Sequence, residues 1–195
     1  MPAFPFLSAS NFNVRPYKIP NLSEVEEEFD SFLENEIEDI LIDLLGPDLY
    51  AAFVDGMSVS SPEDRWANLY NGDTYTYLDR KYTWKGMEKM LIPYVFAKWL
   101  KADFDNYGGN GITIAKMENS ESISPNRRFC NAWNEFAEIA GEKYCFKDTL
   151  YGYLIRENGE SGTFDDTFDE TFSASFDAYL NFYFKAPGFV NQFDL

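Results

Sequence analysis

The stretch from Thr83 to Lys101 constrains the fold most, because its apolar residues surround the whole circumference of a helix. One set follows helical spacing and a second set fills the opposite side, as expected of a helix buried on several faces. We therefore expect the rest of the chain to pack around it. Pro93 lies in its middle, where the missing N–H and the ring clash cost about 3 kcal/mol, so we expect a kink that packing compensates. The two sets are Trp84, Met87, Leu91, Val95 and Trp99, and Met90, Ile92, Tyr94, Phe96 and Leu100.

A long amphipathic segment precedes this stretch and predicts the first helix. Ser23 and Glu26 have the spacing of a capping box, and the acidic residues that follow suit the positive end of the helix dipole. Gly46-Pro47 is a typical helix end followed by a new helix start, so a short second helix is expected over 47–54. The apolar stripe of the first helix consists of Val25, Phe29, Phe32, Leu33, Ile37, Ile40, Leu41, Leu44 and Leu45.

Three further elements are expected around the central stretch. A short helix begins after Ser61-Pro62 and ends at Asn71-Gly72, and residues 73–82 favour a strand or hairpin through their Thr and Tyr residues. Another amphipathic helix begins at Ser124-Pro125 and ends at Gly141, and residues 147–156 are also interpreted as helical. The sequence thus predicts a mainly α fold, a small helical bundle around a buried central helix with a minor β-hairpin.

Two terminal segments differ from this core. Residues 1–21 contain four prolines and unpatterned aromatics, which predicts an extended arm lying on its own core or on a partner. Residues 158–195 repeat Phe at intervals of four, separated by Asp, Thr and Ser, which form poor isolated helices. We expect a C-terminal tail that docks on another surface, and a core domain over 22–157. The polar segment 112–124 is expected to be an exposed loop.

Charge restricts the possible partners. The net charge of −17 opposes binding to a phosphate backbone. From Glu24 to Asp55 there are twelve acidic residues and no Lys or Arg, which predicts a solvated acidic face, a face non-adhesive toward DNA, or one matched to a basic partner. Residues 80–101 contain six basic residues and one acid, so this segment is expected to face the acidic first helix.

No residue pattern indicates catalysis or metal binding. The chain has no histidine, which excludes His-based triads and metal sites, and Cys130 and Cys145 are interpreted as two buried thiols in a reducing compartment. The acidic cluster from Asp165 to Glu170 lacks the spacing of a calcium loop, and the glycines of 108–111 lack the lysine of a phosphate-binding loop. Lys116 and Arg127-Arg128 are interpreted as surface cations near a helix start, with phosphate contact as the alternative. No catalytic, cofactor-binding or metal-ligating residue is predicted, and no cofactor.

The sequence also predicts a compartment. No stretch has the length and apolar character of a membrane helix, and Met1 to Leu7 lacks the basic start of a secretory signal. We expect a soluble protein made in the cytoplasm.

The order of elements resembles the head-to-tail connector, or adaptor, proteins of tailed phages. The resemblance covers about residues 22–141. Within this family, the chain is similar to the connectors of the crAss-like phages of gut bacteria. It rests on Leu44-Leu45-Gly46-Pro47, the Tyr70-Asn71-Gly72 turn, Tyr82-Thr83-Trp84-Lys85-Gly86-Met87 opening a buried helix, and Glu118-Asn119-Ser120 in a polar loop.

This resemblance implies a structural virion protein without enzymatic activity. Connectors of this kind form a closed ring of about a dozen copies at the head-to-tail junction. The implied partners are further copies of the chain, the portal protein, and tail or other connector proteins. Genomic DNA would pass through without specific binding, and no membrane is involved. By analogy, residues 112–124 would be a contacting loop and both termini docking arms.

Two other classes of function stay open on the residues alone. A carboxylate-dependent hydrolase would need a concave site with a carboxyl group of raised pKa. A glycan-binding or adhesion module would present Tyr and Trp side chains on a flat or grooved surface.

Overall fold

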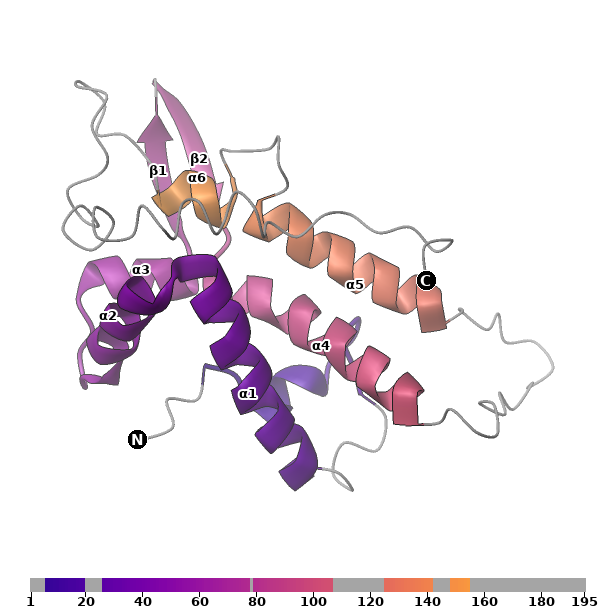
Figure 1. Cartoon of the computed structure of the whole chain (residues 1–195). Helices are drawn as coiled ribbons and strands as arrows, with labels where there is room; N and C mark the ends of the chain where they lie inside the picture. The colour runs from indigo at the N-terminus through magenta and orange to yellow at the C-terminus, as the bar shows by residue number, and fades with distance from the viewer. Residues whose placement is uncertain (1–5, 20–25, 78, 107–124, 142–147, 155–195) are drawn as a thin grey trace.

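The computed structural model describes residues 6–19, 26–77, 79–106, 125–141 and 148–154 (Figure 1). These residues form a mainly α-helical bundle with one small antiparallel hairpin, which confirms the predicted fold class. The elements are a 3₁₀ helix η1 (Ala9–Phe12), α1 (Glu26–Leu45), α2 (Pro47–Ser58), α3 (Asp64–Asn71), β1 (Asp73–Tyr77), β2 (Arg80–Trp84), α4 (Met87–Asn106), α5 (Pro125–Ala140) and α6 (Leu150–Leu154).

Helix α4 is the centre of the bundle. It contacts α1, α3, α5 and η1, and Figure 1 shows it between α1 and α5. Its side chains are buried on several faces, as the apolar pattern predicts, and the helix continues through the buried Pro93. The kink expected at this proline stays a prediction. Buried α4 side chains include Met87, Met90, Leu91, Tyr94, Val95, Phe96 and Ala97.

The predicted start of the central helix at Thr83 is wrong. Thr83 and Trp84 belong to β2, where they pair with Thr74 and Asp73 of β1. Helical spacing from Trp84 to the apolar residues of α4 is therefore coincidental: its ring is buried from a strand position. The helix begins only after Gly86, whose φ of 95° ends the strand.

Two glycines allow the base of the hairpin to close against α3. A Cβ on Gly86 would lie 2.5 Å from the carbonyl carbon of Asn71, and one on Gly72 would lie 2.7 Å from the carbonyl oxygen of Trp84. Both glycines also have positive φ, which side-chain-bearing residues adopt only with strain. This close backbone approach fixes the hairpin at the end of α3.

Helices α1 and α2 meet at the predicted Gly46-Pro47 boundary. Gly46 has a φ of 77°, and Pro47 occupies the first turn of α2. Helix α2 ends at Ser58 instead of the expected Val54, because the buried stripe of Leu49 and Phe53 continues to Met57. The proposed cap at Ser23 lies outside the described residues.

The N-terminal segment 6–19 lies on the core of its own chain, one of the two possibilities that the sequence leaves open. Phe12 is fully buried against Phe29 of α1, with ring centroids 5.0 Å apart. Phe6 stacks on Phe53, and its carbonyl accepts a hydrogen bond from the Tyr70 hydroxyl. An extended chain is expected here, but Ala9–Phe12 form a 3₁₀ turn. Within this turn, the Asn11 side chain accepts a hydrogen bond from the Ser8 N–H at 3.0 Å.

The expected exposed loop 112–124 and the C-terminal tail 158–195 lie outside the described residues, as does the segment 142–147. Within the predicted helical range 147–156, the structure shows only the short helix α6 in the described residues, with Tyr153 and Leu154 buried.

Candidate interaction surfaces

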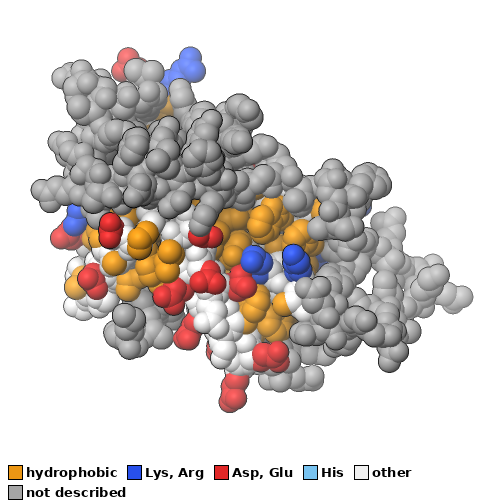
Figure 2. Space-filling model, in the orientation of Figure 1, with side chains coloured by type: hydrophobic (Ala, Val, Ile, Leu, Met, Phe, Trp, Pro, Cys, Tyr) orange, Lys and Arg blue, Asp and Glu red, His pale blue; other side chains and the backbone are white. Residues whose placement is uncertain are grey.

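The exposed side of α1 and α2 forms an acidic face. Its carboxylates are all solvent-exposed, whereas the opposite side of α1 buries Phe29, Leu33 and Ile37 in the core. Figure 2 shows acidic side chains spread across this side of the molecule. The acidic face is defined by Glu26, Glu27, Glu28, Asp30, Glu34, Glu38, Asp39, Asp43, Asp48 and Asp55.

The acidic face favours the first turns of α1 and α2 but is unfavourable in the middle and last turn of α1. Asp30, Glu34 and Glu38 follow one another at intervals of four, where like charges destabilise a helix by about 0.2–0.5 kcal/mol per pair. Asp43 lies in the last turn of α1, at the negative end of the helix dipole. Neither helix contains a Lys or Arg that would offset this repulsion.

One cation from α4 reaches the edge of α1. Lys98 forms an ion pair with Glu36 at 3.2 Å, and Tyr94 donates a hydrogen bond to the same carboxylate at 3.1 Å. Burial, and then Glu36 with Asp39 and Asp43, raise the pKa of Tyr94, so its hydroxyl stays a donor. The expectation that the basic segment 80–101 faces the first helix holds for Lys98, whereas Lys85 of the same segment pairs with Glu138 of α5. Together with the packing of Phe29 and Phe32 on Trp99, the Lys98 contact holds α1 against the central helix.

A second surface has the opposite charge. We define the basic edge as Arg15 and Lys18 of the N-terminal segment with Arg127 and Arg128 of α5. The Arg128 guanidinium donates to the Lys18 carbonyl at 3.3 Å and lies over the Phe96 ring at 5.0 Å. These contacts bring together residues separated by 110 positions in sequence. Among the residues described, no carboxylate forms an ion pair with any of the four cations.

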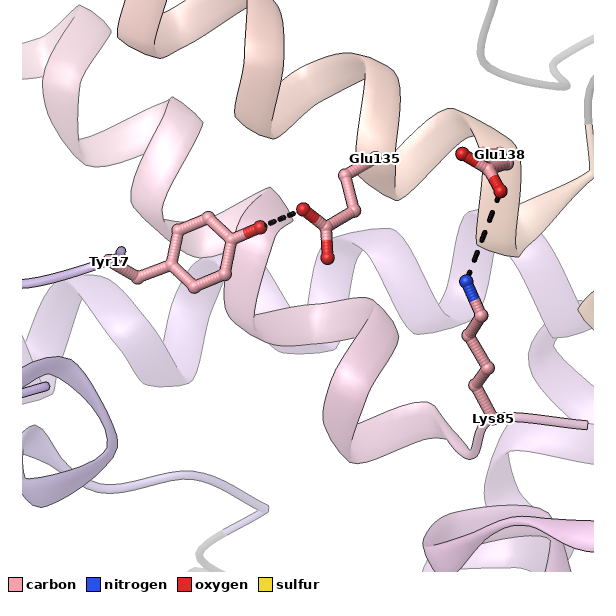
Figure 3. A network of polar contacts seen from close by, with 4 residues as sticks. All are labelled: Tyr17, Lys85, Glu135 and Glu138. Atoms are coloured by element: carbon pink, nitrogen blue, oxygen red, sulfur yellow. Dashed lines mark hydrogen bonds and ion pairs between the residues drawn. The ribbon is translucent and has the colours of Figure 1, made fainter. Parts of the chain in front are cut away.

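The N-terminal segment is tied to α5 next to the basic edge. Tyr17 donates a hydrogen bond to Glu135 and packs edge-on against Phe96, with ring centroids 5.4 Å apart. Figure 3 shows Tyr17 pointing to Glu135, and Glu138 one turn further along facing Lys85 at 3.9 Å. Burial, and then the Glu135 carboxylate, raise the pKa of Tyr17, so this hydroxyl stays a donor at alkaline pH where a free tyrosine loses its proton.

Part of the basic edge could not be predicted from the sequence. Arg127 and Arg128 are predicted surface cations at a helix start, and the structure places them in the first turn of α5. Arg15 and Lys18 are not predicted as their neighbours. The only signal is that residues 6–19 contain two cations and no acid, and a contact over that sequence separation is invisible to local patterns.

Other sequence-derived candidates are not brought into a site. Cys130 is buried in α5, while Cys145, Lys116 and the acidic cluster 165–170 fall outside the described part of the chain. Within that described part, no three His, Cys, Asp or Glu residues gather closely enough to hold a metal ion. The helices described there also lack the combination of length and apolar character that crossing a membrane requires.

Comparison with protein-family models, with curated proteins and with solved structures gives no match to this chain.

Proposed function

We propose that the chain is a structural virion protein, a head-to-tail connector subunit that forms a ring between portal and tail and lines the DNA passage. The observation that carries the proposal is the acidic face, ten exposed carboxylates on two successive helices that contain no Lys or Arg. The order of elements that resembles phage connectors supplies the class of assembly.

A DNA passage needs a wall that does not retain the phosphate backbone. Duplex DNA carries one negative charge per about 1.7 Å of its axis, and affinity for it comes from Lys and Arg that displace counterions. Carboxylates repel this backbone within a Debye length of about 8 Å at physiological salt. The acidic face therefore suits a surface along which DNA moves without binding.

The arrangement of the bundle supports the same role. The carboxylates cost α1 stability locally, and local features that oppose folding are typical of surfaces selected for function. The packing of Phe29 and Phe32 on Trp99, with the contact of Glu36 to Lys98, holds α1 on α4, so that the acidic face keeps one position relative to the core. A wall that guides DNA needs such a fixed position.

The DNA-facing role is tested by charge reversal. In the triple variant E27K/E34K/E38K, three exposed carboxylates of α1 become cations, while the buried stripe is unchanged. We expect no binding of double-stranded DNA by the wild-type chain in a mobility-shift assay at low salt, and clear, salt-sensitive binding by the variant.

The matched control is the variant E27Q/E34Q/E38Q, which removes the negative charges without adding positive ones. It is expected to bind DNA far more weakly than the lysine variant. If the wild-type chain itself binds DNA through this face, the proposed lining of the passage is wrong.

A further inference from the structure

The basic edge lacks an explanation within the described part of the chain. Arg127 and Arg128 lie in the first turn of α5, where cations oppose the helix dipole by about 0.3–1 kcal/mol each. Arg15, Lys18 and Arg127 are solvent-exposed. The described residues supply no carboxylate partner to these cations, so the edge is suited to an anionic segment.

Apolar groups accompany these charges. Val14, next to Arg15, is 68% exposed, whereas most large aliphatic side chains in the described part of the chain are buried or half-buried. Phe129, next to Arg128, is half-buried and stacks on Trp133 with centroids 6.0 Å apart. A partner that matches the edge should therefore combine negative charge with large apolar side chains.

The C-terminal segment of this chain has that composition. Residues 158–195 contain seven acidic residues, one lysine and eight phenylalanines. In the first half of this segment, Phe164, Phe168 and Phe172 alternate with groups that contain Asp or Glu. The acidic face on α1 and α2 also has the charge, but its neighbouring aromatics Phe32 and Tyr50 pack partly buried against their own core, so the C-terminal segment is the better match.

Chain length allows the contact. Helix α6 packs on α5, and α5 has 16 residues, which is about 24 Å of helix. The ten residues from Leu154 to Phe164 span up to about 33 Å when extended. A segment that starts at α6 can therefore reach the first turn of α5 in the same copy, and equally a neighbouring copy in an assembly.

We propose that the basic edge is the docking site of the Phe- and Asp-rich segment 164–180 of this same chain. The cations of the edge bind the carboxylates of the segment, and its phenylalanines cover Val14 and Phe129. This inference does not rest on the proposed connector function. In a ring, the segment of one copy seated on the edge of the next would link neighbouring subunits.

The test uses the full-length chain with the photo-cross-linker p-benzoylphenylalanine in place of Phe168. After irradiation, peptide mapping is expected to find cross-links to residues 14–18 and 125–129. A mixture of isotopically light and heavy chains assigns each cross-link to one copy or to two. Either assignment supports the docking site.

Charge reversal provides the matched control. Replacing three exposed cations of the edge is expected to lower the cross-link yield about tenfold, whereas reversing three exposed cations of the hairpin and α4 should leave it nearly unchanged. Adding the change D165K/D166K/D169K to the edge variant should restore much of the yield. Circular dichroism checks that every variant is folded. The edge variant is R15E/K18E/R127E and the control variant is R80E/K81E/K89E.

Three results would overturn the proposal. The first is cross-linking that maps outside the basic edge, or no cross-linking. The second is a yield that falls equally in the edge and control variants, because that would show a dependence on net charge alone. If the edge variant instead keeps the full yield but loses binding to added inorganic phosphate or DNA, the edge serves another anion and the docking assignment is wrong.

Discussion

At the scale of single residues, Trp84 joins three parts of the molecule. Its ring is 1% exposed and stacks on Tyr153 of α6 with centroids 5.8 Å apart. Its indole N–H donates to the Leu69 carbonyl at the end of α3, at 2.9 Å. The strand β2, the helix α3 and the helix α6 therefore depend on one side chain.

Replacing Trp84 with Phe should destabilise the protein by about 2–4 kcal/mol. The substitution removes buried area and leaves the buried Leu69 carbonyl without its donor, which alone costs about 1–3 kcal/mol. Urea unfolding followed by circular dichroism measures the change. The control is W133F, at a half-buried tryptophan on α5, for which a loss below about 1.5 kcal/mol is expected. Equal losses in the two variants would contradict the role given to Trp84.

Gly86 is a position at which a side chain is poorly tolerated. A Cβ there meets backbone atoms of Asn71 and Gly72 at 2.5–2.7 Å, and neither can move without opening the end of α3. We expect G86A to lower the free energy of unfolding by at least about 2 kcal/mol. The neighbouring exposed residue provides the control K85A, expected to change it by less than about 0.5 kcal/mol. Thermal unfolding of the two variants compares them directly.

Tyr70 links stability to alkaline pH. Burial, and then the Glu88 carboxylate, raise the pKa of its hydroxyl from 10.0 to about 12. Between these values the unfolded chain releases this proton while the folded chain retains it, so stability is full below pH 10 and falls as pH rises toward 12. We expect Y70F to show a shallower loss over this window in urea unfolding at successive pH values. An unchanged pH dependence would contradict the assignment.

At the scale of elements, α1 is a helix whose exposed side opposes its own stability. In E34K, the new cation lies four residues from both Asp30 and Glu38 and replaces two repulsions by two attractions. We expect a gain of about 1 kcal/mol in the free energy of unfolding at low salt, shrinking as salt is added. The uncharged variant E34Q should gain about half as much. A loss of stability in both variants would mean that Glu34 makes favourable contacts.

Most elements could be predicted because their signals are local. Gly46-Pro47, Asn71-Gly72 and Gly141 mark helix ends through backbone geometry alone, and all three carry a glycine with positive φ in the structure. The start of α4 could not be placed, because Trp84 has an apolar ring at helical spacing but occupies a strand. The spacing of apolar residues indicates which residues are buried, but not whether a helix or a strand carries them.

The basic edge could not be predicted for a related reason. It depends on the N-terminal segment lying across α5, held by Tyr17 on Glu135 and by Arg128 on the Lys18 carbonyl. Such contacts reflect tertiary packing between distant segments. By contrast, the acidic face lies on two consecutive helices, so composition and period together suffice to predict it.

At the scale of the whole molecule, charge is distributed unevenly over a bundle built around α4. Helix α1, with the acidic face, packs on one side of α4, and α5, with part of the basic edge, packs on another. The N-terminal segment 6–19 brings the remaining cations of the edge and contacts both α1 and α4 through η1. A subunit with such separated surfaces is suited to repeated contacts in a closed assembly.

The connector proposal is tested by electron microscopy of the purified full-length chain over a range of concentrations, with native mass spectrometry of the same samples. We expect closed rings of about a dozen copies around an open passage, with α1 and α2 on the inner wall. A chain that stays monomeric at every concentration, with or without a portal ring, would contradict the connector proposal. Rings with the acidic face on the outside would contradict its role in lining the DNA passage.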